Sequence, residues 1–480
     1  MSPSVVALAT IFAIVALGAG IGFLAGVHRK MNLEQWTVGG RGFGPVLMYL
    51  LMAGEVYTTF SFLGASGWAY SRGGPTLYIM AYVTLGYVVS FFIVPPLWEL
   101  GRKHGLQTQS DFFSLRYGNK YLAILVSAVG VAFLLPYFQL QVTGLGIIVS
   151  LASFDGIGRT PAMVISVATI AAFVFVSGVR AVAWVSILKD ALMLFAAIAI
   201  GIGIPYIHYG GIGAMFSALA RAHPAHLTMP GATPNLGHTW FVSTVLLTSF
   251  GLYMWPHSFT ATFSAKSAGT LRRNAVVMPI YTITLAFVFF VGFTAVLVVP
   301  GLANGDLSLL TIVRQSFPPW FLGVIGGAGA LTAMVPAAIF VLSAATLCAK
   351  NIYRPIFAPS MSDDDVAKLA RAMVLVLSLI SLYLSIYSST TLVSLLLLGY
   401  AGVTQFFPGV VLGLFWGRVR MAGVFAGLVA GVTAVAVLML TNHDPLFGWS
   451  AGFLALGLNF AVTASVSLFV RHDVPHAMLR

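Results

Sequence analysis

The chain has 480 residues, of which 59% are hydrophobic and only 8% are charged, whereas soluble domains are about one quarter charged. This composition excludes a protein whose surface faces mainly water. The formal net charge of +12 would suit nucleic acid, but the basic residues lie in short clusters between apolar runs, so we expect no nucleic-acid partner.

Apolar segments recur along the whole chain, each long enough to cross about 30 Å of hydrocarbon as a helix. Lipid offers no hydrogen-bond partner to a strand edge, so each segment is predicted to be α-helical. We expect an all-α integral membrane protein with about 13 transmembrane helices. The predicted spans are 5–27, 44–69, 76–100, 120–152, 161–177, 182–207, 239–263, 275–300, 319–349, 370–388, 390–416, 422–441 and 450–470.

The charges between these spans predict an orientation. Arg29 and Lys30 follow the first apolar run instead of preceding it, so we expect a retained span with its N-terminus outside. The alternating topology then places nearly all lysines and arginines in cytoplasmic loops, as the positive-inside rule requires. The other side receives Arg72, Arg159, Arg221 and Arg314. We therefore predict a multi-pass protein of the inner or plasma membrane, surrounded by lipid, with a cytoplasmic C-terminus.

Ionisable side chains inside apolar spans are costly and mark functional sites. Glu55, Lys189, Asp190 and His257 are the candidates. Lys189 lies near the cytoplasmic end of its span, where a lysine stem can instead snorkel back to the surface. The chain has one cysteine, Cys348, and no helical metal-ligand spacing, so we expect neither a metal centre nor a cofactor.

Two spans carry signs of an interrupted helix. Glu55 follows Gly54 and precedes several hydroxyl-bearing residues, while Pro256 precedes His257 and removes a backbone donor. The two spans enter the membrane from opposite sides, and paired breaks of this kind are typical of inverted-repeat transporters with a site near the midplane. Alternatively, Glu55 caps freed N–H groups and Pro256 makes an ordinary helix kink.

Three stretches resemble the sodium/solute symporter family: Trp36 to Arg41, Thr108 to Gly118, and Ala181 to Trp184. The resemblance runs from about residue 35 to about residue 440. It implies the fold of the leucine transporter, a 5+5 inverted repeat with broken first and sixth core helices. The chain would then be one transporter domain, 1–480, with an extra N-terminal span (1–30), two repeats (44–207 and 239–416) and extra C-terminal spans (422–480).

Within that family, the Glu55–Tyr57, Trp255–His257 and Met334–Pro336 regions look most similar to bacterial monocarboxylate permeases. Half-helix N-termini at the breaks would suit a carboxylate. Interhelical packing explains the polar residues after Pro136 as well as solute contact does. The candidate substrate-binding residues are Gly54, Glu55, Tyr57, Thr58, Phe60, Tyr137, Gln141, Trp255 and His257.

The resemblance also places the family's sodium ligands at backbone carbonyls near Gly54 and Tyr57, and at one backbone carbonyl and two hydroxyls on the ninth span. The ninth-span positions fall at Thr332, Val335 and Pro336, so both hydroxyl positions are apolar here. Ser186 replaces an aspartate found in many relatives, and Lys189 with Asp190 lies one turn further on. We therefore expect a proton in place of sodium, carried by Lys189 or Glu55. The candidate ion-coupling residues are Glu55, Ser186, Lys189, Asp190 and Thr332.

These features predict a secondary symporter, not an enzyme, that takes up a short monocarboxylate of the lactate or pyruvate type by alternating access. Proton coupling is favoured over sodium. The alternatives are a sodium-coupled symporter of an amino acid or other polar solute, in which Glu55 pairs with an ammonium group, and a sensor that binds solute without turnover. No repeated filter favours a channel, and no nucleophile motif favours an enzyme.

Overall fold

The computed structural model describes residues 1–26, 33–176 and 179–470. In these ranges the secondary structure is helical, apart from two isolated bridges that pair Phe43 with Ala265 and Leu446 with Trp449. The helices are α1 (Pro3–Gly26), α2 (Leu33–Val38), α3 (Pro45–Val56), η1 (Phe60–Gly64), α4 (Ala65–Arg72), η2 (Gly74–Leu77), α5 (Tyr78–His104), α6 (Gln109–Tyr117), α7 (Lys120–Ala152), α8 (Arg159–Val176), α9 (Val179–Tyr209), α10 (Ile212–Ala222), η3 (Pro224–Leu227), α11 (His238–Gly251), α12 (Pro256–Ser264), α13 (Ala268–Thr282), α14 (Thr284–Val298), η4 (Gly305–Leu307), α15 (Ser308–Ser316), α16 (Pro319–Thr346), η5 (Leu347–Tyr353), α17 (Arg354–Phe357), α18 (Asp363–Tyr387), α19 (Leu392–Val403), η6 (Thr404–Phe406), α20 (Phe407–Phe415), α21 (Met421–Leu440) and α22 (Ala451–Phe469).

Every predicted span coincides with one helix or with consecutive helices, which confirms the all-α membrane fold. Among the described residues, 10 helices are long and apolar enough to cross a membrane, or 11 if the bent pair formed by Pro45–Val56 and Phe60–Arg72 counts as one span. α8 is too short to count among these 10 helices, and a break divides α11 from α12. The count of about 13 and the division into two repeats therefore stay predictions.

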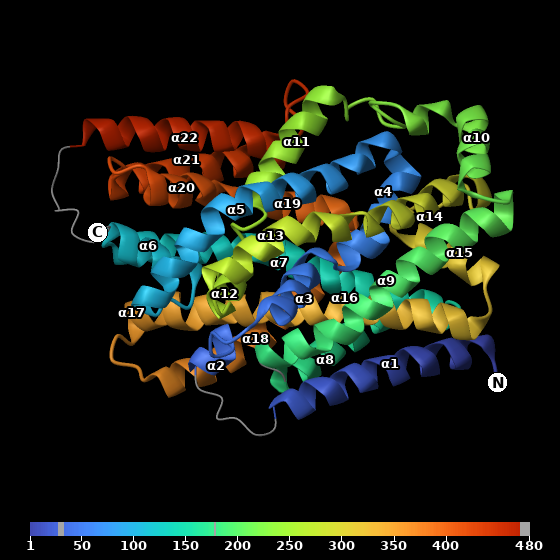
Figure 1. The fold of residues 1–480 in the computed structure, drawn as a ribbon, viewed down its shortest axis with the longest axis horizontal. Helices are drawn as coiled ribbons and strands as arrows, with labels where there is room; N and C mark the ends of the chain where they lie inside the picture. Colours follow the sequence, from blue (N-terminus) through green and yellow to red (C-terminus); the bar gives the residue numbers. More distant parts are fainter. Residues whose placement is uncertain (27–32, 177–178, 471–480) are drawn as a thin grey trace.

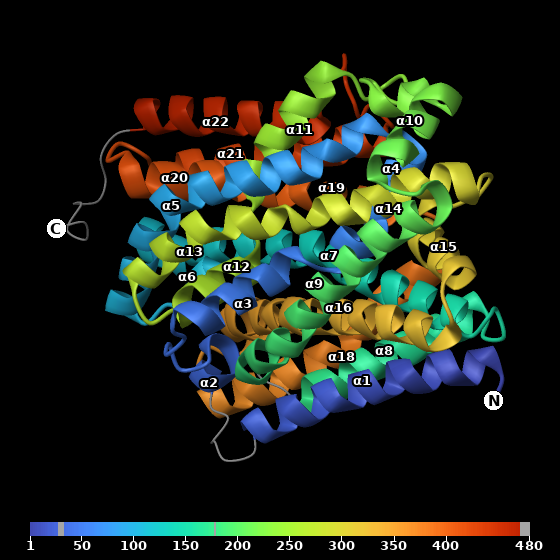
Figure 2. The ribbon, with the colours of Figure 1, turned by 45° about the vertical axis from the view of Figure 1, so that its right-hand side comes forward.

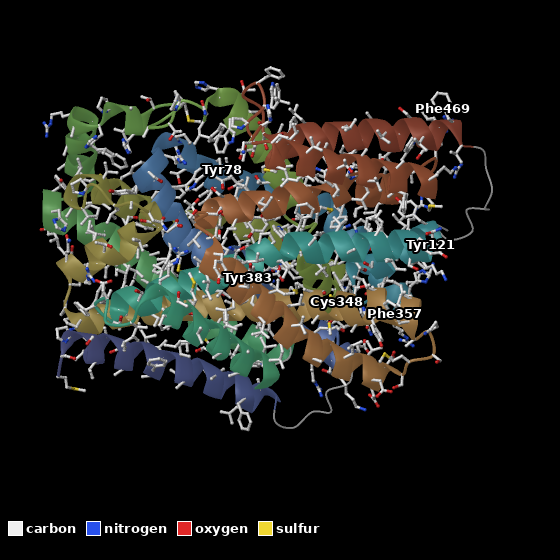
Figure 3. All side chains as sticks on the ribbon, turned by 180° about the vertical axis from the view of Figure 1, so that it is seen from behind. Tyr78, Tyr121, Cys348, Phe357, Tyr383 and Phe469 are labelled. Carbon is white, nitrogen blue, oxygen red and sulfur yellow. The ribbon has the colours of Figure 1, made fainter. Side chains whose placement is uncertain are left out.

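The helices form a bundle in which α16 is central and α1 is peripheral (Figures 1 and 2). In the 18-residue apolar stretch of each span, 94% of the residues are buried in the span that begins with α16 and 22% in α1. The outer helices instead expose large apolar side chains, including Leu24 and Phe469, and Figure 3 shows Phe469 at the margin of the bundle. Such a surface is matched to lipid. The buried interior therefore lies around α16, where α3, α7 and α9 also run.

The two ends of the bundle carry different elements. α6 and α17 lie at one end, and α10 lies at the other (Figures 1 and 2). We call the end with α6 and α17 the inner end, because its loops contain most of the basic residues and the positive-inside rule places such loops in the cytoplasm. This orientation in the cell stays a prediction, and the tail 471–480 lies outside the described residues.

A buried carboxyl group lies near the opposite end, in the loop between α14 and α15. Asp306 Oδ2 accepts a hydrogen bond from the Leu392 N–H at 2.9 Å, at the start of α19. Burial raises the pKa of Asp306 from 3.8 to about 6, although this hydrogen bond opposes the rise. The folded state therefore binds the proton more tightly than the unfolded state. Consequently, this group adds stability as the pH falls through 6, with the effect complete below about 4.

Replacing Asp306 with asparagine should remove this pH dependence. Between pH 7 and pH 5, the melting temperature of the wild type should rise by a few degrees relative to that of Asp306→Asn, because one pKa unit is worth about 1.4 kcal/mol. Thermal unfolding in detergent at several pH values measures the difference. The exposed Asp364→Asn variant serves as the control, and a wild-type curve parallel to that of Asp306→Asn would contradict the prediction.

Candidate functional site

The first break lies between α3 and α4, where sequence analysis predicted it. α3 ends at Val56, and Tyr57 adopts extended backbone angles, φ −89° and ψ 90°. The two halves meet at a bend of 57°, and the second half begins with the π-helical turn η1. A π-helical turn is common at functional sites. The predicted opening of the helix beyond Gly54 is therefore present.

α7 holds this break in place. Gln141 Oε1 accepts hydrogen bonds from the Thr59 N–H at 3.3 Å and from the Thr59 hydroxyl at 2.7 Å. Gly144, one turn along α7, allows this close approach, because a Cβ atom there would lie 2.6 Å from Thr59 Cβ. Gln141 thus satisfies a backbone donor that the interrupted helix leaves free. Its role in this structure is to position the break.

The second break separates α11 from α12. Trp255 is the N-cap of α12 with φ −66° and ψ 140°, and Pro256 occupies the first helical turn. Proline is suited to that position because its fixed φ matches the helix and its missing N–H is not needed there. No side chain caps α12. Pro256 has no N–H, and the Ser258 and Phe259 N–H groups donate to the Trp255 carbonyl, which leaves the His257 N–H of this turn for a ligand. Gln109 on α6 holds the Met254 carbonyl in this break, with Nε2 to oxygen at 2.7 Å.

A cavity lies between the two breaks. Its volume is about 20 Å³, which is room for about one water molecule. The lining residues come from both broken helices and from α5, α7 and α19 and contain no lysine or arginine. They are Met52, Glu55, Val56, Tyr82, Tyr87, Tyr137, Leu252, Tyr253, Trp255, His257, Ser258 and Tyr400. In this state the cavity is therefore a narrow, mainly aromatic chamber, whose polar groups are mostly tyrosine hydroxyls together with Glu55, His257 and Ser258.

Glu55 and His257 are the ionisable groups other than tyrosine in this lining. Glu55 Oε2 accepts a hydrogen bond from the Ser258 hydroxyl at 3.2 Å and lies 3.9 Å from His257 Nε2. Within the described residues, Glu55 Oε1, Trp255 Nε1 and His257 Nδ1 are buried without a hydrogen-bond partner. Buried polar atoms are normally satisfied, so three unsatisfied atoms at one cavity make it the candidate site for a ligand.

Lys189 lies just behind the first break. Its side chain is 0% exposed, so it does not snorkel to the surface. Its Nζ lies 2.7 Å from Asp190 Oδ1 and donates to the Tyr57 carbonyl at 3.3 Å. A Cβ atom on Gly54 would lie 3.2 Å from both Lys189 Nζ and Ser186 Oγ. The ammonium group therefore fills the space beside Gly54 and the Tyr57 carbonyl without lining the cavity.

The positions expected to bind sodium differ in what they offer that ion. The Tyr57 carbonyl accepts from Lys189. The Thr332 carbonyl lacks its usual helical donor, because Pro336 stands four residues further on and has no N–H. Val335 and Pro336 are buried but offer no hydroxyl oxygen. An ammonium group thus contacts one expected sodium ligand, and the preference for a proton over sodium stays a prediction.

The structure separates the predicted substrate residues into two groups. Glu55, Tyr137, Trp255 and His257 line the cavity. Gly54, Tyr57, Thr58, Phe60 and Gln141 lie at or against the first break instead, where, for example, Thr58 Oγ1 accepts from the Phe60 N–H at 3.1 Å. These contacts are structural, and a direct contact with solute stays a prediction for that group.

Sequence reasoning did not identify several lining residues. Tyr82 and Tyr87 lie on α5 and Tyr400 on α19, in spans with no buried charge or break to draw attention to them. The sequence did contain a sign for Ser258. This residue lies two positions after Pro256, in the first turn of α12, next to His257.

Comparison with known proteins gives the family context. The family model described as the sodium:solute symporter family matches residues 36–431. The uncharacterised symporter YhjB of Bacillus subtilis is 46% identical over 97% of each chain. A monocarboxylate transport permease of Rhizobium johnstonii is 28% identical over 98% of each chain.

A solved structure supports the same fold. The chain is similar to a Na⁺-coupled sialic acid symporter in a substrate-bound outward-open state, with a TM-score of 0.81 and 16% sequence identity. The match covers 97% of this chain and 98% of that one. At this identity the likeness concerns the arrangement of helices, whereas the side chains at the site must be judged from this chain itself.

Proposed function

Because the chain belongs to the sodium:solute symporter family, and is thus a membrane transporter that couples a small solute to an ion, we propose that it takes up a short monocarboxylate together with a proton. The unpaired Glu55 Oε1 and His257 Nδ1 in the cavity between two broken helices carry the assignment of the solute site. Alternating access would expose this cavity to each side of the membrane in turn.

Three features of the cavity support a short organic acid. Its mainly aromatic lining gives the apolar part of a short acid a surface to pack against. The uncapped start of α12 offers the His257 N–H and a positive dipole end to a carboxylate. His257, in the first turn of the same helix, adds a ring nitrogen without a partner in the described residues. The similarity to a monocarboxylate permease agrees with this chemistry.

The position of Lys189 supports a proton as the coupling ion. Its ammonium group binds the Tyr57 carbonyl and pairs with Asp190, so it lies beside one of the carbonyls that the family resemblance assigns to sodium. A second cation beside it would be repelled in a medium of low dielectric constant. A lysine or carboxyl group that exchanges a proton during the cycle would supply the coupling instead.

Glu55 favours one alternative. A carboxylate facing the cavity would repel an anionic solute unless one of the two is protonated, but it would pair directly with an ammonium group. A zwitterionic amino acid, taken up with sodium or a proton, is therefore the second candidate. Its own carboxylate would still bind at the start of α12.

Uptake into proteoliposomes distinguishes the two solute classes. We expect unlabelled L-lactate and pyruvate to compete with labelled L-lactate at least about tenfold better than L-alanine or L-proline. A protonated Glu55 forms no ion pair with an ammonium group, and burying that group unpaired costs more than about 1.4 kcal/mol. Net accumulation above the outside concentration would also separate transport from sensing. The assignment fails if the amino acids are accumulated and the monocarboxylates are not.

A further inference from the structure

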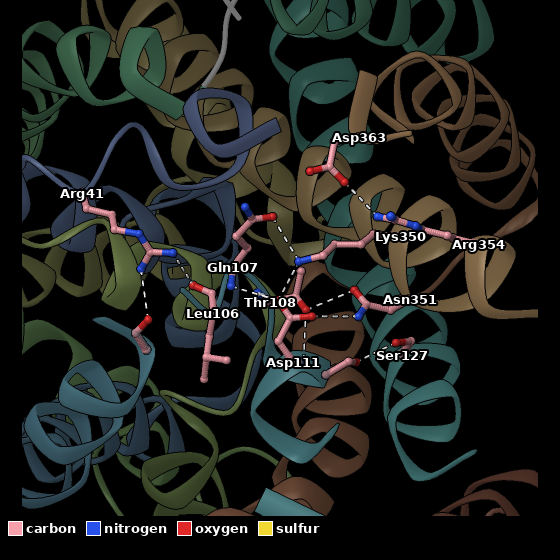
Figure 4. Close-up of polar contacts among 12 residues, drawn as sticks. Arg41, Leu106, Gln107, Thr108, Asp111, Ser127, Lys350, Asn351, Arg354 and Asp363 are labelled. Carbon is pink, nitrogen blue, oxygen red and sulfur yellow. Dashed lines mark hydrogen bonds and ion pairs between the residues drawn. The ribbon is translucent and has the colours of Figure 1, made fainter. Parts of the chain in front are cut away.

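A polar cluster at the inner end joins α6 to η5 (Figure 4). Asp111, in the first turn of α6, accepts from Lys350 Nζ at 2.7 Å through Oδ2 and from Asn351 Nδ2 at 3.0 Å through Oδ1. Lys350 Nζ also donates to Gln107 Oε1 at 3.0 Å, and the Thr108 hydroxyl donates to Asn351 Oδ1 at 3.1 Å. Two consecutive residues of η5 thus bind the α5–α6 turn through four hydrogen bonds.

This contact is stronger than an ordinary surface ion pair. The side chains of Lys350 and Asp111 are only 18% and 16% exposed. Asp111 also accepts from the backbone N–H groups of Gln107 and Thr108. These two bonds hold its carboxylate in place independently of Lys350. Burial alone would raise the pKa of Asp111, but Lys350 and these hydrogen bonds outweigh it and hold the pKa below its ordinary value. The pair is therefore charged and preorganised at neutral pH.

The elements on the two sides of the contact belong to different parts of the bundle. η5 is the π-helical continuation of the central helix α16, and π-helical turns are frequent at functional sites. The α5–α6 turn also contacts the segment that leads into α3, the helix before the first break. Arg41, just before α3, donates to the carbonyls of Leu106 at 2.8 Å and Gly101 at 3.4 Å. The cluster therefore connects the end of α16 with the segment before α3 at the inner end (Figure 4).

The same turn of α6 also contacts the solute site. Gln109, two residues before Asp111, is fully buried and holds the Met254 carbonyl at 2.7 Å. Met254 lies in the second break, between Tyr253 and Trp255, which line the cavity. The nine-residue helix α6 thus makes both contacts. Gln109 binds the second break, and Asp111, two residues further on, binds η5. Displacement of that break must move α6 or break the Gln109 hydrogen bond.

We propose that α6 is the linkage of the inner gate: the Asp111–Lys350 contact locks the inner end closed, and Gln109 connects this lock to the broken helix at the solute cavity. Rearrangement of the second break around the solute would pull α6 away from η5 and open the inner end. The proposal concerns the gate and is independent of which solute or ion is carried.

The only cysteine of the chain provides a reporter of this gate. Cys348 is half-buried in η5, two residues before Lys350, at the end of the bundle that also carries Phe357 (Figure 3). In detergent and without solute, Lys350→Gln should react with N-ethylmaleimide about tenfold faster than the wild type, because it loses a hydrogen bond between charged groups. The matched control Lys368→Gln removes an exposed ion pair with Asp365 and should react at the wild-type rate.

Gln109→Leu tests the connection to the cavity. It should also speed the labelling of Cys348 and the hydrogen exchange of residues 105–111, by about fivefold or more, because α6 loses its anchor on Met254. Gln139→Leu is the control, since Gln139 likewise donates from a side-chain amide to a carbonyl, that of Leu384 at 3.2 Å, but belongs to α7. Wild-type labelling and exchange in Lys350→Gln would overturn the lock. Equal behaviour of Gln109→Leu and Gln139→Leu would overturn the linkage.

Discussion

Replacing Lys189 with alanine is expected to abolish proton-driven accumulation of L-lactate in proteoliposomes. The variant leaves Asp190 buried without its partner at 2.7 Å and frees the Tyr57 carbonyl. Removal of one partner of a buried ion pair costs about 3–5 kcal/mol, so thermal stability should also fall by several degrees. Uptake under an imposed pH gradient, with melting temperature measured in parallel, checks both effects.

The double variant Lys189→Ala, Asp190→Asn separates coupling from stability. Removing both charges should restore most of the lost stability, since no uncompensated buried charge remains. Proton-driven accumulation should stay absent, because no ammonium group then faces the carbonyls of the first break. Accumulation at the wild-type level in either variant would contradict a coupling role for Lys189.

Glu55→Gln should lower L-lactate uptake by about 10- to 100-fold. The variant keeps the size of the side chain and an acceptor for the Ser258 hydroxyl, but it cannot gain or lose a proton beside the solute. A hydrogen bond that involves a charged group is worth about 1.5–3 kcal/mol, which sets this range. Initial rates of uptake at several L-lactate concentrations measure whether the loss lies in binding or in turnover.

Two neighbouring substitutions make this result interpretable. Ser258→Ala removes one hydrogen bond to Glu55 Oε2 and should cost less, about tenfold or below. Gln139→Leu, remote from the cavity lining, should transport at the wild-type rate. If Glu55→Gln matched Gln139→Leu, the carboxyl group would be a structural cap of the break and not part of the solute site.

The sequence was sufficient to predict the elements that carry a strong local signal. Pro256 removes a backbone donor from an apolar span, and α12 does begin there. Gly54 and Glu55 precede a bend of 57°. Buried charge in lipid has few explanations, so Glu55, His257 and Lys189 stood out by type alone. The first two line the cavity, and Lys189 lies against the first break.

Other parts of the site depend on packing between distant segments. The tyrosines of α5 and α19 reach the cavity because the bundle brings those helices together, and tyrosine in a membrane span has many ordinary roles. Gln141 resembled a solute ligand in the sequence, but its amide oxygen holds Thr59. The snorkelling alternative for Lys189 was equally open until its contacts with Asp190 and Tyr57 were known. The type of a residue indicates that burying it in the membrane costs free energy, but only the fold shows which group it contacts.

In the proposed transport cycle the Lys189 ammonium group replaces sodium, so that proton movement drives uptake. Proteoliposomes loaded with a pH-sensitive dye test it directly, with L-lactate added under an inward proton gradient or under an inward sodium gradient at constant pH. We predict accumulation with inward proton flux in the first case and no stimulation by sodium in the second. Sodium-driven accumulation at constant pH, without proton movement, would contradict the account.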